Sequence, residues 1–446
     1  MSHTANARLR PGQTLLLASL TFGLFFGAGN LIFPVSLGLQ SGRAVWVSVA
    51  GFLVAAVGLP ILGVVASALA HATSLLELGQ RVGPRFALWF TAALYLTIGP
   101  FFAIPRTATV SFELAFGARL SGHAKTLALL LFSLVFFAAV LAAALRPGRL
   151  LDYVGRYLTP VFLVLLGILL VVSLGRPAGP LPQPLGAYSA HPGAQGVLDG
   201  YNTMDALAGL AFAIVILEAV RRLGVTTPGR AAVEVAKAGV LAAFAMGVIY
   251  AALALLGARA TSVVGRDANG AVALSAVAQH QFGPVGHALA AAIMLVACLK
   301  TAIGLATSCV QMFGAMFPGR LSAKSWAVLF TGVAFGLANV GLARIISAAV
   351  PVLQLLYPLA VGLILLALLD RWLGQRPWPN RLAIGLIGLV SAMALVTTLP
   401  GIPVAVSNGV LAVGGFLPGF ELGFGWILPG LVGIVLGLFI PRASKQ

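Results

Sequence analysis

Residues 23–34 read GLFFGAGNLIFP and lie within the first long apolar run of the chain. An apolar run of this length predicts a membrane-spanning helix, yet its centre is Gly27-Ala28-Gly29-Asn30. Two glycines and an asparagine weaken a helix at a depth where unpaired backbone groups are costly. Such a break is tolerated where it lines a cavity or binds a ligand. Close packing of a neighbouring helix is the alternative, but Asn30 favours a binding site.

Composition indicates a polytopic α-helical membrane protein. Of the 446 residues, 60% are hydrophobic and only 8% are charged, which leaves more apolar surface than a soluble chain can bury. The net charge of +17 comes from basic residues scattered between apolar runs, so we expect no nucleic-acid partner. The ten acidic residues form no paired carboxylates, and no enzyme motif is present. We therefore expect neither an enzyme nor a bound cofactor.

Twelve membrane spans are expected, each about the length that crosses the hydrocarbon core. They cover residues 14–39, 45–70, 86–115, 124–145, 151–174, 196–220, 232–257, 283–315, 325–343, 345–369, 381–400 and 425–441. Segment 401–424 is a further candidate for a partly re-entrant segment. Of the 27 Lys and Arg residues, 18 fall in loops and tails on the side of the N-terminus and seven on the other side. This bias predicts that both termini are cytoplasmic and that the protein lies in the cytoplasmic membrane.

The pattern of interruptions predicts two inverted five-helix repeats. The first span is broken near residue 28, the sixth looks broken near residue 204, and the third and eighth are the two long spans. Interrupted helices at corresponding places in two halves indicate a binding site between the halves. We expect a first repeat in residues 1–174, an outside loop in 175–195, a second repeat in 196–370, and two extra helices with the C-terminal tail in 371–446.

The second interruption contains Tyr201, Asn202, Thr203 and Asp205. Asn, Thr and Asp side chains compete with the hydrogen bonds of a helical backbone. An aspartate within a membrane span is costly, so by default it indicates a functional site. The alternative is that Asp205 only caps the half-helix that follows it. We interpret the group as part of a binding site.

A polar stripe runs along the eighth span. Lys300, Gly304, Thr307 and Gln311 recur on one helical face, with Thr301 beside them, and this face should point into the protein. Hydroxyl oxygens suit a hard cation such as Na⁺. The Lys300 ammonium could itself occupy a cation position or exchange a proton; snorkelling to an interface is the alternative.

The third span holds Arg106 and Glu113 on one face, seven residues apart. Two charged side chains on one face of a buried helix predict a gating or structural ion pair. Pro100 and Pro105 in the same span predict kinks.

Three motifs together resemble the branched-chain amino acid carrier II family, the Leu/Ile/Val:cation symporters of the amino acid–polyamine–organocation superfamily. They are FFGAGNLIFP at 25–34, GPFFAIPRTA at 99–108 and GYNTMDALAGLAF at 200–212, and the likeness extends over nearly the whole chain. The resemblance implies a leucine-transporter-like fold with spans 1 and 6 broken at mid-membrane. It also implies uptake of leucine, isoleucine and valine by alternating access, typically with Na⁺. An exchanger, or a sensor that binds without transporting, would show the same pattern.

The resemblance also assigns site residues. Gly27, Ala28, Gly29 and Asn30 would bind the substrate carboxylate at a half-helix N-terminus, and the segment from Tyr201 to Asp205 would be its counterpart. The side-chain pocket would be apolar, with Phe101, Phe102 and Phe212 as candidates for lining or gating it.

The ion site implied by the fold consists of the carbonyls of Gly23 and Phe26 with two hydroxyl residues of span 8. In this chain Lys300 stands at the first of those positions and Thr301 follows. A lysine there would repel Na⁺ and could tie span 8 to span 1 in its place. We therefore hypothesise H⁺-coupled or ion-independent transport. Na⁺ held by Gly23, Phe26 and Thr301 is the alternative.

Overall fold

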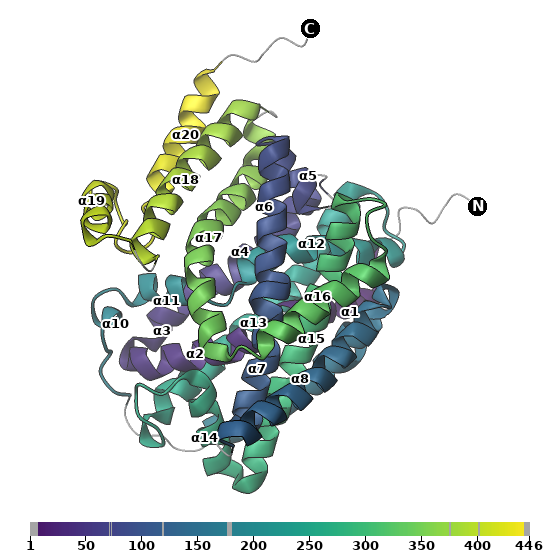
Figure 1. Ribbon diagram of the computed structural model, residues 1–446, viewed down its shortest axis with the longest axis vertical. Helices are drawn as coiled ribbons and strands as arrows, with labels where there is room; N and C mark the ends of the chain where they lie inside the picture. The colour runs from purple at the N-terminus through teal and green to yellow at the C-terminus, as the bar shows by residue number, and fades with distance from the viewer. Residues whose placement is uncertain are drawn as a thin grey trace.

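The computed structural model describes residues 8–70, 72, 74–117, 120–175, 181–373, 376–399 and 402–440, and the regular structure in these ranges is entirely helical (Figure 1). The α-helices are α1 Pro11–Phe25, α2 Ala28–Ser41, α3 Val45–Leu53, α4 Leu59–Leu69, α5 Leu75–Gln80, α6 Pro84–Leu96, α7 Ala103–Phe112, α8 Gly122–Ala144, α9 Thr159–Leu174, α10 Ala187–Ala190, α11 Pro192–Tyr201, α12 Asp205–Arg222, α13 Pro228–Arg259, α14 Gly270–Phe282, α15 Pro284–Met316, α16 Ala323–Ala338, α17 Leu342–Leu373, α18 Pro377–Thr398, α19 Val404–Gly414 and α20 Ile427–Phe439. Parts of the expected 175–195 loop and of the C-terminal tail, residues 176–180 and 441–446, lie outside the described ranges.

The first apolar run forms two helices rather than one. Helix α1 ends at Phe25 and α2 begins at Ala28, with Gly27 in an extended conformation between them. The Gly27 N–H donates to the Asn30 side chain at 2.8 Å, which satisfies a backbone donor that the break exposes. The Asn30 amide therefore stabilises the interruption within its own first turn.

A second interruption separates α11 from α12. The two helices meet at 43°, and Met204 between them adopts a left-handed conformation with φ of 67°. This conformation is uncommon for a residue with a Cβ and marks local strain. Asp205 is the first residue of α12, so its carboxylate lies at the positive end of the helix dipole.

The helix that carries Arg106 is also irregular. A π-helical segment, Thr97–Phe101, connects α6 to α7, and Gly99 within it has a non-helical backbone. Pro100 contributes to this irregularity because it has no N–H for the helical ladder. The kink lets α7 begin afresh at Ala103, one turn before Arg106.

The outer surface is apolar, as expected for contact with lipid. Within the described ranges, eight helical segments are long and apolar enough to cross a membrane, and the bent pair of α11 and α12 would make a ninth. Helices α1, α16, α19 and α20 are shorter but also apolar. Large side chains such as Val171 and Phe244 are about three-quarters exposed, which a water-soluble surface rarely shows in such number. The chain is a multi-pass membrane protein.

Small residues allow the central helices to pack closely. Helix α13 packs on both α1 and α2, and α15 packs against α7 and α12. A Cβ on Gly38 of α2 would lie 1.9 Å from the Ala254 carbonyl oxygen, and one on Gly257 of α13 would lie 2.1 Å from the Val35 carbonyl oxygen. Such close backbone approach through small residues is typical of membrane helix pairs.

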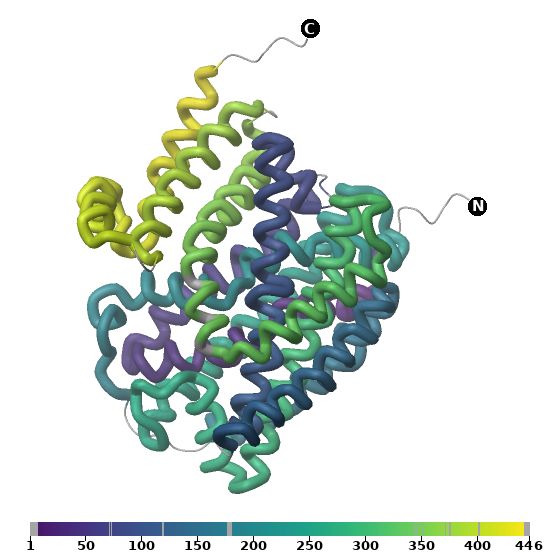
Figure 2. Tube along the Cα trace, viewed as in Figure 1, coloured from purple at the N-terminus to yellow at the C-terminus, as the bar shows by residue number. Residues whose placement is uncertain are grey.

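The C-terminal helices lie at the edge of this bundle. Helix α20 packs along α18, and α19 lies beside this pair, away from the core (Figure 2). With 11 residues, α19 is about 16 Å long, roughly half of the hydrocarbon thickness. It is therefore too short to cross the membrane on its own.

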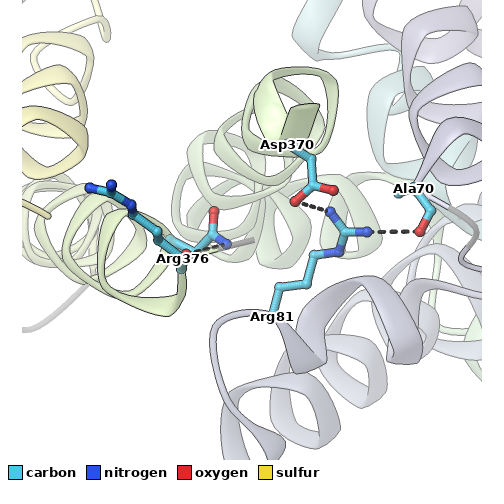
Figure 3. Close-up of polar contacts among 5 residues, drawn as sticks. Ala70, Arg81, Asp370 and Arg376 are labelled. Atoms are coloured by element: carbon cyan, nitrogen blue, oxygen red, sulfur yellow. Dashed lines mark hydrogen bonds and ion pairs between the residues drawn. The ribbon is translucent and has the colours of Figure 1, made fainter. Parts of the chain in front are cut away.

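An ion pair ties the α5–α6 connection to the end of α17. Arg81 lies 2.6 Å from Asp370, and its other terminal nitrogen donates to the Ala70 carbonyl at 2.7 Å (Figure 3). Nearby, the Arg381 side chain donates to the Val82 carbonyl at 3.0 Å. We call the Arg81–Asp370 pair and its Ala70 contact the latch.

Candidate functional site

A small pocket lies where the two interruptions meet. It encloses about 30 Å³ and is contributed by α1, α2, α7, α12 and α15. Its lining is Leu24, Phe25, Ala28, Gly29, Asn30, Ile98, Ala103, Arg106, Thr107, Thr203, Met204, Asp205, Ala208, Phe212, Thr301 and Leu305. The volume is that of about one water molecule, so a larger ligand requires the pocket to widen.

Asn30 holds the two interruptions together. Its side-chain amide donates to the Asp205 carboxylate and to the Tyr250 hydroxyl of α13, while its oxygen accepts from the Gly27 N–H. Thr203 supports Asp205 from the other side, because its hydroxyl accepts from the Asp205 N–H at 3.3 Å. Asn30, Asp205, Tyr250 and Thr203 are all buried. One side chain thus links α2, α12 and α13 at the pocket.

Lys300 is fully buried beside the first interruption. Its ammonium donates to the Gly23 carbonyl at 3.1 Å and to the Phe26 carbonyl. The rings of Phe162, Phe22 and Phe26 lie 4.5, 5.5 and 5.5 Å from the nitrogen. Two carbonyl dipoles and three ring faces all favour a positive charge. Complete burial rules out snorkelling to the interface.

The neighbouring positions are tightly packed. A Cβ on Gly23 would lie 2.1 Å from the Thr159 hydroxyl, and one on Gly27 would lie 2.9 Å from the Thr301 hydroxyl. The Thr301 hydroxyl itself donates to the Leu24 carbonyl at 3.4 Å. Helix α15 therefore lies directly against the open end of α1.

The expected pairing of Arg106 with Glu113 is wrong. Glu113 begins the π-helical segment Glu113–Gly117 that follows α7, and it pairs with Lys125 of α8 at 2.9 Å. Lys125 is near because α8 folds back beside α7, a contact that spacing within one helix could not reveal. Among the described residues, the Arg106 side chain has no hydrogen-bond or ion-pair partner.

Tyr201 and Asn202 do not line the pocket. They line a separate cavity of about 410 Å³ bounded by α11, α17, α18 and the 420–426 segment. Tyr201 stacks on Tyr357 with ring centroids 4.1 Å apart. Tyr201 and Asn202 thus face this cavity, whereas the next three residues, Thr203, Met204 and Asp205, line the pocket.

A vestibule of about 1160 Å³ adjoins the pocket. Its walls come from α2, α7, α14 and the start of α17, and it shares Ala28, Gly29 and Arg106 with the pocket. Phe212 lines the pocket and packs edge-on against Phe25, whereas Phe101 is exposed on the outside of the bundle. The pocket therefore opens toward one end of the molecule, and the latch lies elsewhere, at the ends of α4 and α17.

Sequence reasoning missed three aromatic residues of the site, Phe22, Phe162 and Tyr250. Each lies in an apolar stretch and would pass as core packing. Tyr250 offered the one usable signal, because a hydroxyl within a span needs a partner.

The fold is that of known membrane transporters. Mhp1, a nucleobase-cation-symport-1 family transporter with bromovinylhydantoin bound, superposes with a TM-score of 0.59 at 13% identity, covering 97% of this chain and 94% of that one. MhsT in complex with L-phenylalanine superposes with a TM-score of 0.56 at 16% identity, covering 97% and 100%. The broken helices and buried site thus belong to a leucine-transporter-like transporter fold.

Sequence comparison narrows this class to one family. The family described as branched-chain amino acid transport protein matches residues 11–444. The branched-chain amino acid permease BrnQ of Lactobacillus delbrueckii subsp. lactis is 46% identical, covering 95% of each chain, and BraB of Bacillus subtilis is 41% identical, covering 97% of each. The chain belongs to the branched-chain amino acid transport protein family, and it is a membrane transporter rather than an enzyme.

Proposed function

We propose that the protein imports leucine, isoleucine and valine across the cytoplasmic membrane by alternating access, without Na⁺. Twelve spans would cross the bilayer: two inverted five-helix repeats, residues 1–174 and 196–370, plus two extra helices. Family membership and the two interrupted helices support this arrangement. Both termini would be cytoplasmic, as the Lys and Arg distribution favours.

The pocket is the proposed substrate site. Its walls are mostly apolar, including Phe25, Ile98, Phe212 and Leu305, which suits a branched aliphatic side chain. The Asp205 carboxylate would accept the substrate ammonium. The first-turn amides of α2, at Ala28 and Gly29, point toward the carboxylate end, since the first N–H groups of a helix lack internal partners.

The proposal that transport does not use Na⁺ rests on Lys300. Its ammonium contacts the Gly23 and Phe26 carbonyls, the same two carbonyls that the family resemblance assigned to the coupling ion. A positive charge at that position repels Na⁺, since two like charges a few ångströms apart in a poorly hydrated site interact strongly. The ammonium would hold α15 against α1 as an ion would. Transport would then be coupled to H⁺ or uncoupled.

This arrangement would correspond to an outward-facing state. The vestibule reaches the pocket from the side of α14, which the Lys and Arg distribution favours as outside, and the latch would close the cytoplasmic side. Substrate would enter through the vestibule, widen the pocket and release into the cytoplasm after the latch opens.

Leucine uptake into proteoliposomes tests this function, with Na⁺ and pH gradients imposed one at a time at a fixed membrane potential. We expect saturable leucine uptake that a Na⁺ gradient does not increase. A steep rise with Na⁺ would assign the protein to Na⁺ symport, with the ion at Gly23, Phe26 and Thr301 or elsewhere. Saturable binding without flux would assign it to a sensor.

A further inference from the structure

The charged residues of the pocket suggest a role for Arg106 that differs from an ion-paired gate. Arg106 and Asp205 are the two charged residues that line the pocket, one on α7 and the other on α12. The Asp205 carboxylate is already engaged by Asn30. No ion pair joins Arg106 to Asp205 or to another described carboxylate.

The guanidinium of Arg106 is half-buried and lines the vestibule, so water or a ligand must satisfy its donors. Arginine remains charged in proteins and carries five N–H donors that water or an anion must satisfy. The four described ion pairs are Arg81–Asp370, Lys125–Glu113, Arg222–Glu218 and Lys237–Glu234. Glu113 is the nearest carboxylate along the sequence in the same span, and it accepts a hydrogen bond from Lys125. The N–H donors of Arg106 are thus available to a ligand, while its charge interacts with that of Asp205 across the pocket.

Its position adds a second observation. Arg106 lines both the vestibule and the pocket, together with Ala28 and Gly29 from the first turn of α2. A substrate that passes from vestibule to pocket must therefore pass Arg106. The first turn of α2 presents backbone N–H groups at the same boundary, except that the Gly27 N–H is occupied by Asn30. Arg106 supplies charge where one of these donors is already used.

We propose that Arg106 is the receptor for the substrate α-carboxylate and that the pocket recognises a zwitterion between Arg106 and Asp205. This inference rests on the proposed function and deepens it. A guanidinium and a carboxylate form two parallel charge-assisted hydrogen bonds, which fix orientation as well as adding affinity. The ligand class is an α-amino acid with both charges intact, its side chain directed at Phe25 and Phe212.

Equilibrium binding to purified protein tests this role with paired ligands. A panel of amino acids first identifies the tightest ligand of the wild type, expected to be leucine, and its amino alcohol, leucinol, then serves as the partner that lacks the carboxylate. We expect leucine to bind the wild type about 10- to 100-fold more tightly than leucinol. In Arg106→Gln, the affinity for leucine should fall to that for leucinol, while the affinity for leucinol should stay unchanged. Arg106→Lys should recover part of the difference.

The controls separate this role from a structural one. Arg344 also lines the vestibule but not the pocket, and Arg344→Gln should leave the preference for leucine over leucinol intact. Equal losses of affinity for leucine and for leucinol in Arg106→Gln would overturn the inference. Unchanged affinity for both ligands would also overturn it. If another amino acid is the tightest ligand, the proposed substrate is wrong. Arg106 is then judged with that amino acid and its own amino alcohol.

Discussion

At the scale of single residues, Asn30 bears the largest share of the site's hydrogen bonding. It satisfies a backbone N–H exposed by the break and ties it to Asp205 and Tyr250. When one partner of a buried hydrogen bond is removed, the group that remains is buried without a partner and this costs free energy. Asn30 therefore couples the stability of the break to the integrity of the binding site.

Substitution of Asn30 by alanine tests this coupling. Asn30→Ala leaves the Gly27 N–H, Asp205 and the Tyr250 hydroxyl short of a partner, so we expect a loss of about 2 kcal/mol or more in stability and at least a tenfold loss of leucine affinity. Asn339 is a matched control, because it bonds Ser133 and Phe335 and none of these three residues lines the pocket. Asn339→Ala should lower the thermal stability in detergent without changing leucine affinity. Similar leucine affinity in both variants would contradict the assignment.

Gly23 provides a packing test at the same scale. In Gly23→Ala, the added methyl group would lie 2.1 Å from the Thr159 hydroxyl and 2.7 Å from a Val154 methyl. Overpacking of this kind costs about 1–3 kcal/mol and would push α1 away from Lys300. We expect lower thermal stability and reduced uptake.

The control for Gly23 is another helical glycine. A Cβ on Gly167 in α9 would meet no atom of a neighbouring helix within 4 Å, so Gly167→Ala should be neutral or stabilising by about 0.5–1 kcal/mol. The packing argument fails if the two substitutions have the same effect on thermal stability and uptake.

The sequence located some of these residues and misplaced others for identifiable reasons. Asn30, Asp205 and Lys300 stood out because polar groups are costly within apolar spans, and the structure brings all three to the meeting point of the interruptions. The Arg106–Glu113 pair was inferred from spacing within one helix, but Lys125 reaches Glu113 from the next helix. Contacts between helices depend on tertiary packing, which one sequence does not display.

At the scale of helices, the latch joins an element of the first half to the end of α17. Arg81 bonds Asp370 and the Ala70 carbonyl where α4, α5 and α17 meet (Figure 3). Both ionic side chains are about a quarter exposed or less, so the pair is partly shielded from solvent. An interaction of this kind contributes up to about 1 kcal/mol, enough to shift a two-state equilibrium several-fold.

Charge exchange tests whether the latch favours the outward-facing state. Arg81→Asp and Asp370→Arg should each change the leucine uptake rate by about two- to fivefold, and the double exchange should recover part of the change. Glu218→Gln, which removes the exposed Glu218–Arg222 pair of α12, is the control and should have little effect. If the double exchange behaves like the sum of the two single changes, the latch has no gating role.

Element boundaries were predicted well where apolar runs are long and less well where they are short. The expected spans 283–315 and 232–257 correspond closely to α15 and α13, because loops of charged, Gly and Pro residues delimit them. Pro100 predicted a kink at Thr97–Phe101, but the apolar pattern indicated no π-helical segment there or at Leu151–Leu158. Hydrophobic periodicity does not distinguish a π-helical turn from an α-helical one.

At the scale of the whole molecule, composition alone determined the class of protein. The resemblance of three motifs predicted the family, and the family match over residues 11–444 confirms it. The transporter fold follows from superposition with Mhp1 and MhsT. The number of crossings, the repeat relationship and the coupling ion remain predictions, since they depend on the membrane and on ions.

The central claim is that the Lys300 ammonium takes the place of a coupling Na⁺. The most direct measurement is leucine binding with NaCl or choline chloride at equal ionic strength, for wild type, Lys300→Thr and the exposed-site control Lys324→Thr. We expect leucine binding by wild type and by Lys324→Thr to be independent of Na⁺. We expect Lys300→Thr to bind leucine weakly without Na⁺ and more tightly when Na⁺ is added. Wild-type binding that already requires Na⁺ would contradict the account, because Lys300 would then not replace the ion.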